Sequence, residues 1–136
     1  MTFEAVKVEL TNSTGFPRRF TCASNAAITK GTLLVLSDPR TAAAHSTTGS
    51  VPCAGIALEG VSGVDNVTSI SAWTDGVFEM KCSGAINVGD AVKLGTTPNC
   101  VIAAGAESNA ASGAVVLGYA LETGINAEVI NVRVKL

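Results

Sequence analysis

Apolar residues along this chain fall into short runs that alternate with polar residues or are interrupted by glycine, asparagine and proline. At the C-terminus, Ile130, Val132, Val134 and Leu136 alternate with polar neighbours, which is the two-residue period of a strand that buries one face. No stretch keeps a helical period over three turns. The chain is therefore predicted to be all-β, closing into a small barrel or sandwich of short antiparallel strands.

The same pattern predicts the individual strands. Segment 3–10 is expected to be a half-buried strand with Val6, Val8 and Leu10 on one face. Thr32–Leu36 is apolar on both faces and is expected to be a central strand. Further strands are expected at 20–23, 51–59, 67–73, 77–82, 91–94, 100–103 and 130–136.

Turns and loops are predicted between these strands. Thr74-Asp75-Gly76 is typical of a hairpin turn that leads into strand 77–82. Residues 41–50 are small and polar without periodicity, so they are expected to form an exposed loop carrying the only histidine, His45. Gly55 offers little side-chain volume, as is needed where another backbone comes close.

The chain also repeats itself. Five residues recur at a constant separation of 58 positions, as 86 − 28 shows for one isoleucine pair, and a five-residue block recurs at 63 positions, which is 118 − 55. Two copies of one β-unit are the simplest interpretation, although the sequence leaves open whether they share one barrel or form two lobes. We expect an N-terminal strand and arm at 1–19 and a duplicated β domain at 20–136, with copies at about 20–60 and 78–122. The matches are Phe20, Ala27, Ile28, Gly31 and Leu36 with Phe78, Ala85, Ile86, Gly89 and Leu94, and Gly55-Ile56-Ala57-Leu58-Glu59 with Gly118-Tyr119-Ala120-Leu121-Glu122.

Composition narrows the function. The 136 residues suit one domain, and only 15% are charged, so the surface must be rich in small uncharged residues that can pack against other protein. A net charge of −2 gives no attraction to nucleic acid. The N-terminus lacks the features of a signal peptide, and no apolar run could span a membrane, so synthesis in a cytoplasm is expected.

No set of residues predicts an active site. His45 has only Ser46 nearby in sequence, which is too close to be a triad partner. The repeat places Glu59 and Glu122 at equivalent points, where a pseudo-twofold axis could bring two carboxylates together, but structural roles are the preferred interpretation. Neither an enzyme activity nor a small-molecule substrate is therefore expected.

No set of residues predicts a cofactor or metal site either. Cys22, Cys53, Cys82 and Cys100 form no Cys-x-x-Cys pair, so they are expected to be buried free thiols and neither a metal nor a redox site. Lys81 lies in a duplicated β-unit, as the modified lysine of biotinyl and lipoyl carrier domains does, but it is expected within a strand and not at a hairpin tip. No cofactor is predicted.

From Phe20 to Leu136, the chain resembles the capsid decoration proteins of tailed phages, also called head cement proteins. Each matching motif is short, and their order and spacing together make the resemblance fairly specific. The motifs are Ile28-Thr29-Lys30-Gly31-Thr32-Leu33-Leu34, Asp38-Pro39-Arg40-Thr41-Ala42, Gly55-Ile56-Ala57, Thr74-Asp75-Gly76-Val77-Phe78, Gly84-Ala85-Ile86, Val88-Gly89-Asp90, Gly118-Tyr119-Ala120-Leu121-Glu122 and Val132-Arg133-Val134.

The resemblance implies a small β-rich virion protein, often a homotrimer, that binds the major capsid protein on the outside of an icosahedral head and stabilises it by bridging capsomers. Another virion or fibre component and, less favoured, a carrier domain are the alternatives. Residues 1–19 match the family less well and could form an arm that reaches a neighbouring subunit or the shell. Candidate interface residues are Phe3, Phe16, Arg18, Arg19 and Trp73.

Overall fold

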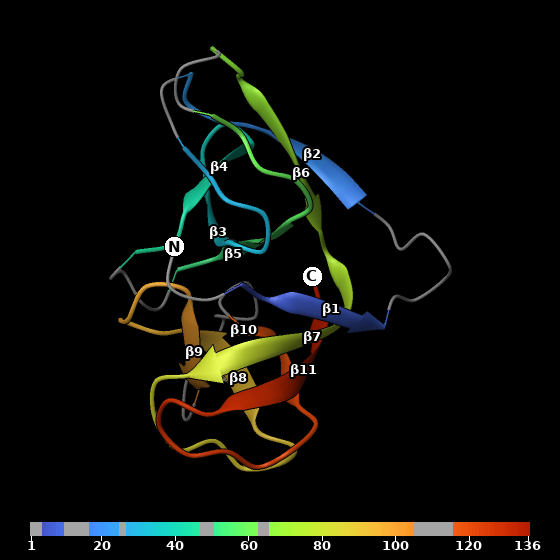
Figure 1. Cartoon of the computed structure of the whole chain (residues 1–136), viewed down its shortest axis with the longest axis vertical. Coiled ribbons are helices and arrows are strands. Elements are labelled where there is room, and N and C mark those ends of the chain that lie inside the picture. The colour runs from blue at the N-terminus through green and yellow to red at the C-terminus, as the bar shows by residue number, and fades with distance from the viewer. Residues whose placement is uncertain (1–3, 10–16, 25–26, 47–50, 63–65, 105–115) are drawn as a thin grey trace.

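The computed structural model describes residues 4–9, 17–24, 27–46, 51–62, 66–104 and 116–136. Over these residues every regular element is a strand, and the strands form two small barrels stacked along the long axis of the molecule (Figure 1). The all-β prediction is confirmed. The strands are β1 (Val6–Glu9), β2 (Pro17–Thr21), β3 (Leu33–Ser37), β4 (Thr41–Ala44), β5 (Cys53–Ala57), β6 (Ser69–Trp73), β7 (Asp75–Cys82), β8 (Ala91–Leu94), β9 (Cys100–Ala103), β10 (Val116–Ala120) and β11 (Val129–Lys135).

The two barrels have the same strand order. Barrel one closes as β2-β4-β3-β5-β6, and barrel two closes as β7-β9-β8-β10-β11, with β1 added along β7. Each barrel holds one parallel pairing at the same place, β2 with β4 and β7 with β9. Strand for strand, barrel two therefore repeats barrel one, and residues at matching places in the two pairing patterns are called counterparts below.

The sequence repeat is visible in individual hydrogen bonds. Ile28 forms an isolated antiparallel bridge with Val61, and Ile86 forms the same bridge with Gly124, which agrees with the separations of 58 and 63 positions (86 − 28 and 124 − 61). One sequence match is displaced. Phe20 pairs with Ile70 as Met80 pairs with Ile130, so the counterpart of Phe20 is Met80 and not Phe78. A shift of two residues keeps the same face of the strand inward, and for this reason the sequence pattern did not reveal it.

Two glycines mark the close backbone approach that each barrel needs. Gly55 has a φ of 144°, and a Cβ added to it would lie 2.5 Å from the carbonyl oxygen of Trp73. Its counterpart Gly118 lies against the Arg133 carbonyl so closely that an added Cβ would overlap the oxygen. The predicted role of Gly55 is confirmed, because a side chain there would separate β5 from β6.

The core continues from barrel two into barrel one. Barrel one has a small core of its own around Leu34, Ile70 and Ala72. The larger cluster fills barrel two and also includes Leu33 and Ile56 of barrel one, both almost fully buried. The end of barrel one that carries these two residues is therefore packed onto barrel two.

The junction between the barrels differs from the sequence prediction. Thr74-Asp75-Gly76 does not form a hairpin, because β6 and β7 belong to different barrels and do not pair; the chain passes at Thr74 from one barrel into the other. The N–H of Leu136 donates to the Thr74 carbonyl at 2.9 Å, so the C-terminus lies at this junction (Figure 1).

The strand β1 runs between the two barrels. It pairs with β7 of barrel two, while the N–H of Ala5 donates to the Gly31 carbonyl of barrel one at 2.8 Å. Ala5 is buried, but Val6 and Val8 are 39% and 53% exposed. The predicted strand is present as β1, but the prediction that its valine face is buried is wrong, because the described parts of the chain do not cover these valines. Phe3 and Leu10, at the ends of the predicted segment, lie outside the described residues.

His45 is the main correction. Residues 41–44 form β4, and His45 follows it, buried at 5% exposure between the barrels. Its Nδ1 accepts the Asn99 N–H at 3.1 Å, which leaves Nε2 to donate to the Gly95 carbonyl at 2.7 Å. The predicted exposed loop is wrong for residues 41–45, because short strands of small residues lack the apolar period by which strands are recognised. Residues 47–50 of the predicted loop lie outside the described residues.

Candidate protein-binding surface

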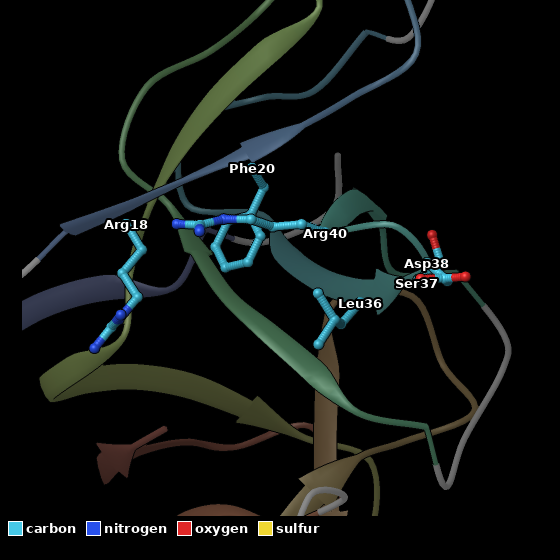
Figure 2. Close-up of a pocket in the computed structure, with 6 residues that line it drawn as sticks. All are labelled: Arg18, Phe20, Leu36, Ser37, Asp38 and Arg40. Carbon is cyan, nitrogen blue, oxygen red and sulfur yellow. The ribbon is translucent and has the colours of Figure 1, made fainter.

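An open hollow of about 560 Å³ lies on barrel one, beside β2 and the β3–β4 turn. Phe20 and Leu36 supply its apolar surface, and Figure 2 shows the Arg40 side chain passing over the Phe20 ring, with 5.9 Å between guanidinium and ring centre. Arg18, Ser37 and Asp38 complete the lining. An apolar floor with a charged rim is typical of a surface that binds another protein.

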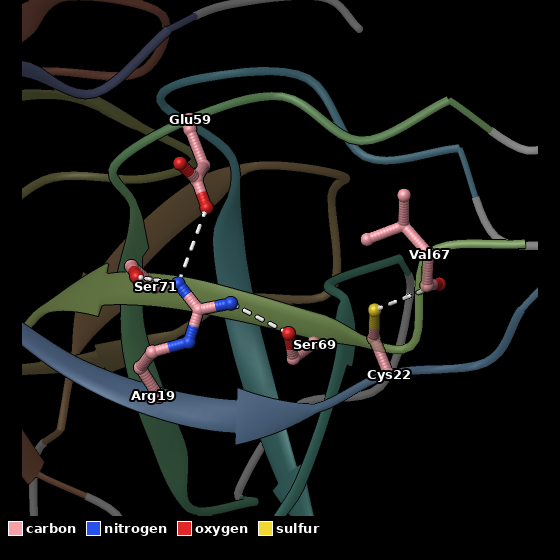
Figure 3. A network of polar contacts seen from close by, with 6 residues as sticks. All are labelled: Arg19, Cys22, Glu59, Val67, Ser69 and Ser71. Carbon is pink, nitrogen blue, oxygen red and sulfur yellow. Dashed lines mark hydrogen bonds and ion pairs between the residues drawn. The ribbon is translucent and has the colours of Figure 1, made fainter. Parts of the chain in front are cut away.

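Of the five residues singled out in the sequence, Arg18 lies in this hollow and is exposed. Its neighbour Arg19 points to the opposite face of β2, where it is held by its own barrel (Figure 3). Arg19 donates to Ser71 Oγ at 2.8 Å and to Ser69 Oγ at 2.5 Å, and lies 3.7 Å from the Glu59 carboxylate. A guanidinium with these partners orders the barrel surface, so it is less available to a second protein than Arg18.

Trp73 lies at the junction of the barrels. It is half-buried and packs against the cluster that joins them, and Lys7 Nζ of β1 lies 5.5 Å from its ring centre. The indole thus contributes to the chain's own core. Phe3 and Phe16, the remaining candidates, lie outside the described residues.

A second exposed apolar surface lies on barrel two. Tyr119 on β10 is 46% exposed, and Leu121 directly after the strand is 42% exposed. Val88, in the β7–β8 connection, is 61% exposed, and its N–H donates to Thr123 Oγ1, so it belongs to the same end of the barrel. These three residues are called the Tyr119 face below. Neither this face nor the exposed surface of Phe20 and Leu36 could be identified from the sequence, because strand-like runs do not distinguish covered from uncovered apolar residues.

The carboxylates that the repeat equates do not form a pair. Glu59 lies by Arg19 in barrel one, whereas Glu122 accepts the N–H of Asn131 at 2.9 Å in barrel two. Each carboxylate therefore has its own structural partner in its own barrel. Among the described residues there is no group of three or more His, Cys, Asp or Glu side chains placed to hold a metal ion.

The cysteines and Lys81 also have structural positions. All four cysteines are buried and free, as predicted. Burial raises the pKa of the Cys53 thiol to about 12, and burial is also the main cause of the raised pKa of Cys82 and Cys100. A thiol with a raised pKa is a poor nucleophile at neutral pH. Lys81 lies within β7, paired with Val129 on one side and Cys100 on the other, and not at a hairpin tip.

The described parts of the chain include no helix long and apolar enough to cross a bilayer. A family model described as phage cement protein matches residues 12–136. Among solved structures, the chain is similar to the head fiber gp8.5 N base of bacteriophage phi29, with a TM-score of 0.58 and 16% identity over 88% of this chain and 95% of that one. That likeness shows the fold alone, and no curated protein matches the sequence.

Two barrels of duplicated strands with exposed apolar surfaces form a body suited to contacts with other proteins, and the family model covers nearly the whole of both barrels. The chain therefore belongs to the phage cement proteins and is a structural protein of the phage virion.

Proposed function

We propose that this chain binds the outer surface of an icosahedral phage head as a homotrimer, contacts the major capsid protein and stabilises the shell by bridging capsomers. The observation that carries the proposal is the family match over residues 12–136. The protein would be made in the host cytoplasm and reside on the capsid exterior. It needs neither a cofactor nor a catalytic residue for this role.

Simple thermodynamics explains how such a protein strengthens a shell. A ligand that binds the assembled lattice and not its separated capsomers stabilises the lattice by mass action. Three linked copies bind with a high effective concentration once the first copy is in place. Two barrels with a shared core supply the rigid body that this requires, because little conformational freedom is lost on binding.

Residues 1–19 are proposed to include an arm that reaches a neighbouring subunit or the shell. The segment contains β1, which is paired with β7, and the first residues of β2. Removing residues 1–3 keeps both strands and the buried Ala5, and it tests the first part of the segment. A truncated protein that binds heads as tightly as the whole chain would contradict a role for those residues.

The test of the main proposal uses purified protein and undecorated heads of the cognate phage. Light scattering should give a trimer mass, and co-sedimentation should saturate at a fixed ratio of trimers to capsomers. Saturated heads should melt at a higher temperature than bare ones. Protein that does not sediment with heads at any concentration would refute the proposal.

A second candidate is a component of a head fibre. It is favoured by the likeness to the fiber base named above, whose chain is covered to 95%. Stoichiometry separates the two functions. A cement protein should occupy every equivalent site of the shell and raise its melting temperature, whereas a fibre base should leave the melting temperature of the head unchanged.

A further inference from the structure

Barrel one covers a surface of barrel two, and the matching surface of barrel one is uncovered by the described residues. On barrel two, Leu94 is fully buried, and Asn99 is 4% exposed because it contacts barrel one. Their counterparts in barrel one are Leu36, which is 39% exposed, and Arg40, which is exposed. Both line the hollow. The hollow on barrel one therefore corresponds to the surface of barrel two that barrel one covers, but the described residues leave the hollow uncovered.

The surface through which barrel one contacts barrel two also has an exposed counterpart, which lies on barrel two. Barrel one contacts barrel two through Leu33 and Ile56, which pair with each other and are almost fully buried. Their counterparts Ala91 and Tyr119 pair in the same register on barrel two. Tyr119 is exposed there, together with the other residues of the Tyr119 face. The two surfaces that form the contact between the barrels therefore each have a counterpart, the hollow on barrel one and the Tyr119 face on barrel two. No described part of the chain covers either counterpart.

A contact between two unlike surfaces can continue from one molecule to the next, since each copy offers both halves. We propose that the hollow of one copy accepts the Tyr119 face of the next copy, so that copies associate head to tail through a contact that repeats the one between the two barrels. In a closed ring every barrel would then rest on its neighbour. This inference rests on the self-association put forward under the proposed function, and not on capsid binding.

Charge supports a second copy as the occupant. Arg18 and Arg40 outnumber Asp38 around the hollow, and Glu122 directly follows Leu121 of the Tyr119 face. Opposite charges at the rims favour the orientation in which these two surfaces meet. The counterpart of Arg18 is the buried Phe78, so the contact between copies is more polar than the contact inside the chain. This is typical of an association between subunits that fold separately.

The test uses two variants that each remove one half of the contact. Leu36→Arg alters the hollow, and Tyr119→Arg alters the opposite face. Both positions are exposed, so both variants should fold with unchanged circular dichroism. By sedimentation velocity, each variant alone should be monomeric at concentrations where the unaltered chain is oligomeric, which corresponds to a loss of affinity of about 30-fold or more. Ile125→Arg is the control, because Ile125 is 64% exposed and its counterpart Ser62 is exposed too; it should associate normally.

Mixing the two monomeric variants gives the sharpest result. Leu36→Arg retains an intact Tyr119 face, and Tyr119→Arg retains an intact hollow. The mixture should therefore form a 1:1 heterodimer, which differently tagged chains would reveal by co-purification at high concentration. No heterodimer, an unaltered chain that stays monomeric, or variants that still associate would overturn the inference. Head binding is measured separately: a Leu36→Arg chain that still self-associates but no longer saturates heads would overturn the inference and place the major capsid protein in the hollow instead.

Discussion

Asn99 and Arg40 occupy the same position in the two barrels, directly before β9 and β4, and both have a positive φ, 58° and 46°. Asn99 is 4% exposed: its Oδ1 accepts the Leu33 N–H at 2.6 Å, and its Nδ2 donates to the Gly31 carbonyl at 3.4 Å. Arg40 is exposed and its Nε donates to the Arg19 carbonyl at 3.0 Å. The same backbone shape thus joins two barrels at one position and borders an open hollow at the other.

This relationship predicts different costs for the same substitution. Glycine accepts a positive φ, so Asn99→Gly removes the side chain without straining the backbone. The buried Leu33 N–H then loses its acceptor, and the free energy of unfolding should fall by about 1–3 kcal/mol. Arg40→Gly is the matched control and should change it by about 0.5 kcal/mol or less. Urea unfolding of both variants measures the difference, and equal losses would show that Asn99 does not join the barrels.

Gly118 should tolerate no side chain. Any Cβ there overlaps the Arg133 carbonyl, so Gly118→Ala must push β10 away from β11. We expect a loss of more than about 3 kcal/mol, or failure to fold. Gly84 has no atom within 4 Å of an added Cβ, and Gly84→Ala should leave the thermal midpoint within a few degrees of the original. A Gly118→Ala protein as stable as the Gly84→Ala one would contradict the close approach.

Some of this architecture could be predicted from the sequence, and the limits have physical causes. The strands 91–94 and 100–103 reappear in the structure, because β-branched residues such as Val92, Val101 and Ile102 fit a pleated surface. The repeat separations of 58 and 63 positions reappear because the two barrels have the same strand order. The prediction of an exposed loop around His45 was wrong because the alanine and threonine residues of β4 do not produce the alternation of apolar and polar residues that identifies a strand. Thr74-Asp75-Gly76 has the composition of a hairpin turn, but turn composition does not say whether the flanking strands pair with each other.

The candidate surface was harder to predict for a different reason. Arg18 was singled out as a candidate interface residue, and in the structure it lines the hollow. Leu36 and Leu94 are the same residue type in matching strands, yet one is exposed and the other is buried. The difference comes from how barrel one sits on barrel two, which is a tertiary contact between distant parts of the chain. Local sequence pattern carries no information on it.

Alkaline pH should destabilise the fold through Cys53. Burial raises the pKa of this thiol from 9.0 to about 12, so the folded chain keeps its proton where the unfolded chain loses it. The stabilisation is fully present below pH 9, and it declines by up to about 1.4 kcal/mol per pH unit as the pH rises from 9 toward 12. Cys53→Ala removes this contribution. Plotted from pH 8 to 11, its unfolding free energy should fall less steeply than that of the unaltered chain, and parallel curves would contradict the raised pKa.

Leu36 and Leu94 themselves offer a last comparison. Leu94 is fully buried in the cluster that joins the barrels, so Leu94→Ala leaves a cavity and should cost about 2–5 kcal/mol. Leu36 is 39% exposed in the hollow, and Leu36→Ala should cost about 1 kcal/mol or less in a monomer. The two variants are measured by urea unfolding at low protein concentration. If self-association covers the hollow, the cost of Leu36→Ala should rise with protein concentration, because association stabilises the folded chain by mass action. A cost that is small and constant at every concentration would mean that the hollow remains open in the assembled protein.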